Sequence, residues 1–275
     1  MKYIDMHVHV DSADKDKLDY LAETARKNET MLAMIGGLGY GERDFIPNEQ
    51  VIEICKKYPD CFIPVAKLTL WDKADPAEVY HYAEMGARGF KCIYPYYEYD
   101  HDLYMPLYEA AEKCGMPILF HTGNYRPCHF DTICRRPMIK NMQPLTLDRI
   151  ARSFQQLNII MAHLGTKIFQ HEAAEYIKCH ANLYADLGGC GQWRRIQPKE
   201  LMELLSQSMT EFDPEMRNFR KLVLGSDAYV TYPGIVTDGQ KYYRLLLERI
   251  GVPQEIISDI LGGTVAKWFG IELEH

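Results

Sequence analysis

Short apolar runs rich in β-branched residues alternate along this chain with longer runs of helical periodicity. This rhythm is typical of β-α-β units, in which each crossover helix returns the chain to the same edge of a parallel sheet. About eight apolar runs are present, the number that a (β/α)8 barrel requires. The strands predicted from these runs are residues 3–9, 30–35, 62–68, 89–94, 117–121, 159–163, 183–186 and 222–226.

Helix signals separate the predicted strands. Asp75-Pro76 places a capping side chain and a proline at the start of one helix, and Gly86 and Gly115 stand where helix ends favour positive φ. The helices predicted in this way include residues 15–28, 47–58, 76–85, 103–114, 145–156 and 167–180. Since the chain has 275 residues and shows no linker, we expect one α/β TIM-barrel domain over residues 1–272. Residues 273–275 could be the remnant of an expression tag.

Two long loops are predicted at the carboxyl-terminal face of the barrel, where active sites of this fold are built. Residues 122–144 follow the fifth strand and are dense in Arg, Cys, Asn and Pro. Residues 188–198 follow the seventh strand and contain Trp193, Arg194 and Arg195. Both loops are therefore candidates for contacting a substrate.

Charge and cysteine content narrow the class of partner. The formal net charge of -7 argues against binding to nucleic acid or to an anionic membrane, because both need a basic patch. We see neither a run long enough to span a bilayer nor a secretion signal at Met1. The eight cysteines form no Cys-x-x-Cys pair, which is typical of reduced thiols in a cytoplasmic protein. A small-molecule substrate is the partner expected, and a homo-oligomer remains open.

The sharpest motif is Asp5-Met6-His7-Val8-His9. Residues two apart on a strand point to the same face, so His7 and His9 should converge inside the barrel. Two adjacent imidazoles suit a borderline metal such as Zn2+, with Mn2+ or Fe2+ as alternatives. Asp5 shares the alternation and could bind the metal or support its ligands. The other interpretation is an ordinary strand with core histidines.

Three further strands deliver polar residues to the same rim. His121 ends the run 117–121, and His163 ends the run 159–163. Asp227 follows Gly225-Ser226 at the end of the last strand, where it could bind the metal and accept a proton from water. Hydrogen-bonded structural histidines and a helix-capping aspartate are the alternatives.

Lys91 lies on the fourth predicted strand, where burial of a lysine is costly unless it is paired or modified. It could be a carbamylated bridge between two metals, a charged contact to substrate, or a core lysine paired with an acid.

Other side chains of the rim could surround a carboxylated or aromatic substrate, although solvated loop residues would look the same. These are Arg126, Arg135, Arg136, Tyr125, Tyr94, Tyr96, Tyr97 and Tyr99. Cys128-His129 and Cys134 lack the spacing of a second metal site.

These motifs together resemble the amidohydrolase superfamily, in particular its amidohydrolase-2 branch of metal-dependent hydrolases and decarboxylases. The resemblance rests on the first motif, on the histidines that end the fifth and sixth strands, on Gly225-Ser226-Asp227, and on the run from Ile260 to Gly270. Thr264 departs from the branch, which usually has Asn after the paired glycines.

The resemblance implies specific roles. His7, His9, His121 and Asp227 would bind one metal, and His163 would orient or polarise the substrate or water. Lys91 looks like the fourth-strand lysine that is carbamylated in two-metal members.

We therefore predict a metal-dependent hydrolase in which metal-activated water attacks a small carbonyl, amide or lactone substrate. Asp227, His163 and Lys91 are its predicted catalytic residues. The alternative is a non-oxidative decarboxylase of an aromatic or unsaturated carboxylic acid at the same site. A third reading, a barrel that only binds a ligand, fits the aspartate beside the histidines less well.

Overall fold

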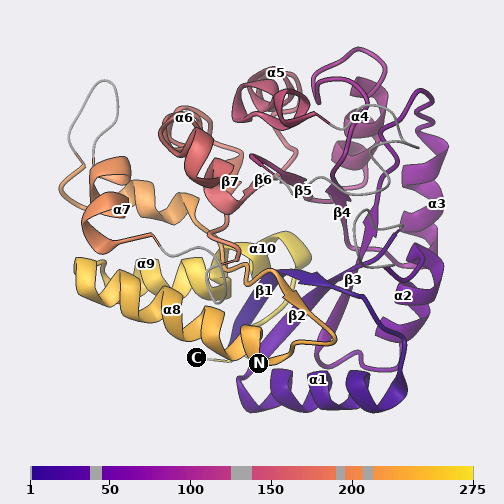
Figure 1. Ribbon diagram of the computed structural model, residues 1–275, viewed down its shortest axis with the longest axis horizontal. Coiled ribbons are helices and arrows are strands. Elements are labelled where there is room, and N and C mark those ends of the chain that lie inside the picture. The colour runs from indigo at the N-terminus through magenta and orange to yellow at the C-terminus, as the bar shows by residue number, and fades with distance from the viewer. Residues whose placement is uncertain (1, 38–44, 125–137, 190–195, 207–212, 275) are drawn as a thin grey trace.

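The computed structural model describes residues 2–37, 45–124, 138–189, 196–206 and 213–274. Eight parallel strands form one curled sheet in the spatial order β7-β6-β5-β4-β3-β2-β1-β8 (Figure 1). This arrangement confirms the predicted (β/α)8 fold. The strands are β1 (Tyr3–His9), β2 (Thr30–Ile35), β3 (Phe62–Lys67), β4 (Gly89–Cys92), β5 (Ile118–His121), β6 (Ile159–Ala162), β7 (Leu183–Ala185) and β8 (Ala228–Tyr229).

Helices cover the outside of the sheet (Figure 1). The six predicted helices are all present, and their bounds differ from the prediction by a few residues. The α-helices are α1 (Lys15–Lys27), α2 (Asn48–Cys55), α3 (Ala77–Met85), α4 (Met105–Lys113), α5 (Asp148–Ser153), α6 (Thr166–Cys179), α7 (Pro198–Leu205), α8 (Gly234–Ile250), α9 (Gln254–Ser258) and α10 (Thr264–Phe269). Within the described ranges, no helix has the length and apolar character needed to cross a membrane.

The prediction of a regular eighth strand over residues 222–226 is wrong. Only Leu222 forms a bridge pair, with Ala185, and the regular strand β8 begins at Ala228. The segment nevertheless closes the sheet, because Val223 N donates to Ala185 O (2.9 Å) and Met6 N donates to Leu224 O (2.9 Å). Asp227, with φ of 63°, interrupts the extended conformation at the point where the chain would have continued as a strand.

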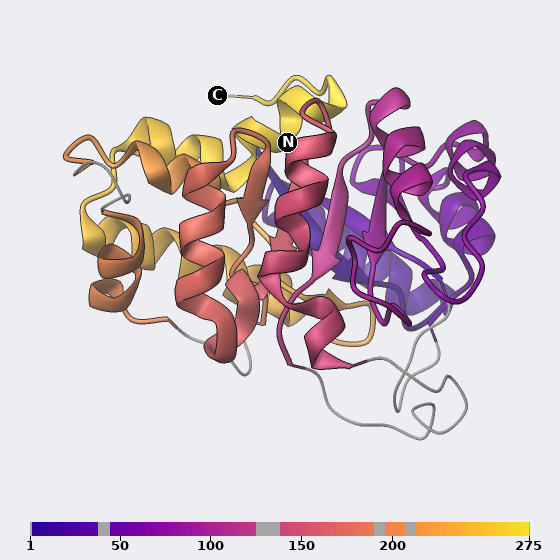
Figure 2. The same ribbon diagram turned by 90° about the horizontal axis from the view of Figure 1, so that it is seen from above.

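Buried apolar side chains fill both the interior of the barrel and the layer between strands and helices. The interior cluster includes Ile63, Ile160 and Val223, and each fully buried side chain of this size contributes about 1.5–3 kcal/mol. Val265 and Phe269 of α10 belong to the same cluster. The C-terminal segment lies beside the N-terminus (Figure 2), so α10 packs over the amino ends of the strands, opposite the rim predicted to be functional.

Candidate metal centre

A bulge in β1 sets the direction of the two histidines of the first motif. Asp5 is paired with Leu32 of β2, but Val8 is paired with Met34, so β1 contains one extra residue between these pairs. The bulge interrupts the alternation that would have placed Asp5 on the face of His7 and His9.

Asp5 has a different role from the one that alternation predicts. Its Oδ1 accepts hydrogen bonds from the backbone N–H groups of His7 and Ser226, both at 3.0 Å. Burial raises the pKa of Asp5 to about 6, although these hydrogen bonds oppose the shift. Asp5 thus links β1 to the segment that precedes Asp227. It helps to position the possible ligands through their backbone and is not placed as a ligand itself.

His7, His9 and Asp227 form a compact group of possible ligands. His7 Nε2 lies 3.1 Å from His9 Nε2, and Asp227 Oδ1 lies 3.2 Å from His9 Nε2 and 3.4 Å from His7 Nε2. Asp227 is held in its left-handed conformation by the bond from its N–H to His7 O (2.9 Å). The three donor atoms lie within 4.8 Å of one another, so they could hold a single cation.

Asp186, which the sequence reasoning did not single out, fixes the orientation of His7. Its Oδ2 lies 2.8 Å from His7 Nδ1, and its Oδ1 accepts from the N–H groups of His163 and Gly188, both at 2.7 Å. A carboxylate can only accept here, so His7 carries its proton on Nδ1 and turns the lone pair of Nε2 towards His9 and Asp227. The sequence did contain a signal for Asp186, because it is an acidic residue at the end of a predicted strand. The same signal identified Asp227.

His121 and His163 stand next to this group. Their rings are 4.9 Å apart, and the ring of His163 is 5.2 Å from that of His7. His121 Nε2 is buried and has no hydrogen-bond partner within the described part of the chain. The donor atoms of His121 do not fall within the compact group, and its role as a ligand stays a prediction.

Lys91 extends into the same centre. Its side chain is buried, and Nζ lies 3.1 Å from His7 Nε2. Burial lowers the pKa of Lys91 to about 8, while Asp186 and Asp227 favour its charged form. The geometry places Lys91 beside the ligands and leaves its three interpretations open.

The protonation states suit a metal. Burial lowers the pKa values of His7, His9 and His121, and it lowers that of His163 to about 4. Burial alone would raise the pKa of Asp227, but the influence of His7 and the hydrogen bond with His9 bring it below the usual range. Neutral imidazoles beside an ionised carboxylate are the forms that bind divalent metals. The residues present therefore fit such an ion.

Gly188 makes room for the centre. A Cβ atom at this position would lie 2.8 Å from Asp186 Oδ1 and 3.0 Å from His163 Nδ1. Any other residue would push these two groups apart.

The predicted substrate-contacting residues have mixed outcomes. Tyr99 is fully buried, and its hydroxyl donates to the backbone oxygens of Cys92 and His121, which is a structural role. Tyr96 stacks on Trp71 with ring centroids 5.7 Å apart. The remaining candidates of the two loops lie outside the described residues: Tyr125, Arg126, Cys128, His129, Cys134, Arg135, Arg136, Trp193, Arg194 and Arg195.

Comparisons with known proteins extend over nearly the whole chain. A family model described as Amidohydrolase matches residues 4–271. None of the curated proteins matches the sequence.

Many solved structures share the fold, including the three that follow. An uncharacterized TIM-barrel protein from Bordetella bronchiseptica is 16% identical, with a TM-score of 0.68 and coverage of 98% of this chain and 99% of that one. A probable 2-pyrone-4,6-dicarboxylic acid hydrolase from Acinetobacter baumannii, with citric acid bound, is 13% identical (TM-score 0.61, coverage 98% and 100%). A 5-carboxyvanillate decarboxylase from Novosphingobium aromaticivorans, with bound manganese, is 13% identical (TM-score 0.57, coverage 98% and 97%). At these identities the likeness shows the fold alone.

Proposed function

Because the chain belongs to the amidohydrolase family whose model matches residues 4–271, we propose that it is a metal-dependent hydrolase of a small carbonyl, amide or lactone substrate. The observation that carries this proposal is the buried group of His7, His9 and Asp227 at the carboxyl ends of the strands. A divalent metal held there would supply a Lewis acid that polarises a carbonyl and lowers the pKa of water towards ~7.

The chain's own residues complete the chemistry. Asp227 is ionised, so it can accept the proton of the attacking water and return it to the leaving nitrogen or oxygen. His163 is neutral at pH 7 and can donate a ring N–H hydrogen bond to the carbonyl oxygen as negative charge develops there. Lys91 is near enough to stabilise the same charge, or to serve as a modified ligand.

Zn2+ is the metal that imidazole and carboxylate ligands favour, with Mn2+ and Fe2+ as alternatives. Elemental analysis of the purified protein would identify the ion, and mass spectrometry would detect a carbamyl group on Lys91.

A non-oxidative decarboxylase is the second candidate, favoured by the several decarboxylases among the structural neighbours. In that reaction the carbon–carboxylate bond breaks, carbon dioxide leaves, and the ring carbon takes up a proton. Asp227 and His163 are the groups positioned to handle that proton.

A paired screen separates the two reactions. Acid release from lactones or amides, absent in a His9→Ala variant, would support the hydrolase. Carbon dioxide release from aromatic acids with the same dependence on His9 would replace it by the decarboxylase. If the metal-loaded protein does neither, the proposal fails.

A further inference from the structure

The barrel has a gap in its backbone pairing where the last segment meets the chain that leaves β7. On one side of the gap, Val223 N donates to Ala185 O (2.9 Å), and on the other side Gly189 N donates to Ser226 O (3.2 Å). Within the described part of the chain, no direct backbone hydrogen bond joins the two segments between these points. We call this gap the seam.

A tyrosine hydroxyl from helix α8 occupies the seam. Tyr243 Oη accepts from Leu187 N (2.5 Å) and from Gly225 N (3.3 Å), and it donates to Gly225 O (3.3 Å). A hydroxyl has one donor and two acceptor sites, so it can satisfy these three backbone groups at once. Tyr243 is fully buried and Leu187 nearly so, which makes an unpaired Leu187 N–H unfavourable.

The hydroxyl keeps the two segments apart. A direct backbone hydrogen bond would bring the N and O atoms of the two segments to about 2.9 Å. The path from Leu187 N through Tyr243 Oη to Gly225 O instead contains two bonds, of 2.5 Å and 3.3 Å. The side chain of Tyr243 therefore widens the seam by inserting an oxygen atom between its two sides.

The carboxylate of Asp186 lies in the same seam. A Cβ atom at position 225 would be 2.7 Å from Asp186 Cβ and 2.8 Å from its Oδ2, so Gly225 leaves the space that Asp186 fills. Oδ2 in turn lies 2.8 Å from His7 Nδ1. The width of the seam thus determines whether this carboxylate can reach His7.

Two consecutive N–H groups after Asp186 connect the hydroxyl with the carboxylate. The N–H of Leu187 is bonded to Tyr243, and the N–H of Gly188 is bonded to Asp186 Oδ1 (2.7 Å). Planar peptides leave only two soft torsions per residue, so fixing the first N–H restricts the direction of the second. With Oδ1 held in this way, Oδ2 is the oxygen that faces His7.

We propose that Tyr243 is a positioning residue of the metal centre, because its hydroxyl sets the width of the seam and the seam orients Asp186 towards His7. Its hydrogen bonds described above end on backbone groups, so we assign its effect on metal binding to Asp186. The inference rests on the proposed function in that it concerns the same metal centre, but its test needs no turnover.

Tyr243→Phe removes the hydroxyl and keeps the ring. We expect the affinity for Zn2+, measured by competition with a chromophoric chelator, to fall by about tenfold, the lower end of the loss caused by removing a partner behind a metal ligand. In long-range 1H–15N spectra of the metal-free protein, the two ring nitrogen signals of His7 should move towards each other. The reason is that a less firmly held Asp186 lets the His7 proton spend part of its time on Nε2.

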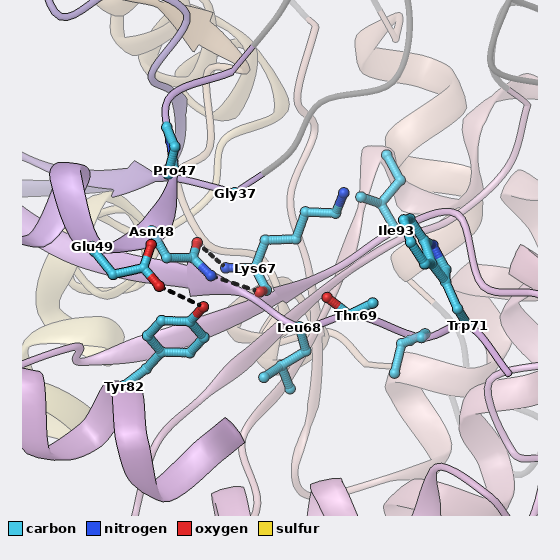
Figure 3. Close-up of a pocket in the computed structure, with 11 residues that line it drawn as sticks. Gly37, Pro47, Asn48, Glu49, Lys67, Leu68, Thr69, Trp71, Tyr82 and Ile93 are labelled. Carbon is cyan, nitrogen blue, oxygen red and sulfur yellow. Dashed lines mark hydrogen bonds between the residues drawn. The ribbon is translucent and has the colours of Figure 1, made fainter. Parts of the chain in front are cut away.

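Tyr104→Phe is the matched control. Tyr104 is also fully buried, and its hydroxyl also bonds to the backbone, at Leu70 O (2.6 Å) and Trp71 O (2.9 Å). Trp71 lines a separate pocket of about 350 Å³ at the carboxyl ends of β2, β3 and β4 (Figure 3), and no residue that lines this pocket belongs to the candidate metal centre. Tyr104→Phe should therefore change the Kd for Zn2+ by less than about threefold and leave the His7 signals in place.

A double variant tests whether Tyr243 acts through Asp186. If it does, Tyr243→Phe should cost less than about threefold in Zn2+ affinity when Asp186→Asn is already present, compared with about tenfold in the parent protein. A purely structural effect of the hydroxyl would give the same loss in both backgrounds. That result would overturn the inference.

Two other results would also overturn it: an unchanged Kd in Tyr243→Phe, or an equal loss in Tyr104→Phe. If the parent protein does not bind Zn2+, the proposed function fails and the His7 signals decide alone. Movement in Tyr243→Phe but not in Tyr104→Phe would then support the inference, and any other pattern would overturn it.

Thermal melting checks that each variant is folded. If Tyr243→Phe does not fold, Gly225→Ala takes its place, because the new methyl group would press on Asp186 from the opposite side of the seam. We expect it to weaken Zn2+ binding and to move the His7 signals in the same direction. Unchanged His7 signals in Gly225→Ala would overturn the inference.

Discussion

Replacing Asp186 by Asn tests how the metal centre is built. Asp186 Oδ2 receives the proton of His7 Nδ1, while Oδ1 receives the N–H groups of His163 and Gly188. An amide has one oxygen and one NH2 group, so it cannot accept on both sides. If it keeps the two backbone bonds, its NH2 group faces His7 Nδ1 and drives the His7 proton to Nε2, the atom that faces His9 and Asp227.

The expected loss of metal affinity follows from this change of tautomer. Loss of a hydrogen-bonding partner behind a metal ligand costs about 10- to 100-fold in metal affinity, or roughly 1.4–2.7 kcal/mol. We expect Asp186→Asn to reach at least that range, because the His7 proton must move from Nε2 back to Nδ1, against the Asn NH2 group, before Nε2 can bind. Both tautomers of a neutral imidazole carry one proton, so the difference in affinity should not depend on pH while His7 is neutral.

Competition with a chromophoric chelator gives the Kd for Zn2+, and long-range 1H–15N spectra of the metal-free protein report the tautomer of His7. Asp148→Asn is the matched control. It alters a second His–Asp pair, His180 Nε2 to Asp148 Oδ1 at 2.8 Å, neither member of which belongs to the possible ligand groups of the centre. An unchanged Kd in Asp186→Asn, or an equal loss in Asp148→Asn, would refute the reasoning.

Four other expectations can be tested directly. His9→Ala should abolish stoichiometric Zn2+ binding in elemental analysis, and full retention would remove His9 from the ligands. Asp227→Asn should preserve the fold measured by circular dichroism while turnover falls by roughly 10²-fold or more, so near-normal turnover would exclude Asp227 as the base. Gly188→Ala should weaken Zn2+ binding by about tenfold or more, because its methyl group meets the oxygen that orients the ligands. Burial raises the pKa of Asp5 in the folded protein to about 6, above the ~3.9 of an unfolded chain. Proton binding by Asp5 therefore stabilises the folded state fully below pH ~4, and this stabilisation is lost as the pH rises through 6. In the metal-free protein, the free energy of unfolding measured in urea should therefore decrease less between about pH 4 and 6 in Asp5→Asn than in the parent protein. An equal decrease in both proteins would contradict the raised pKa of Asp5.

The sequence predicted the fold because periodicity is a local property. The bounds of β1 and β2 match the prediction, and strands β3 to β7 lose only one or two residues at their ends. The segment before Asp227 was harder, because its bonds to Ala185 and Met6 are long-range, and a positive φ at an aspartate leaves no local signal.

The candidate site was predicted in part for a related reason. Residues two apart on a strand bring His7 and His9 together whatever the remaining fold is. The bulge that removes Asp5 from their face depends on pairing with β2, which no single-strand pattern contains. Asp186 acquires its position from partners far along the chain, so its residue type alone does not distinguish it from other strand-end residues.

Helix α10 limits the routes by which small molecules could reach the candidate metal centre. Within the described residues, Val265 and Phe269 pack against the apolar filling and close the amino end of the barrel. Substrate and product would then both enter and leave at the carboxyl end of the barrel. We expect product that rebinds the metal centre to inhibit competitively against substrate.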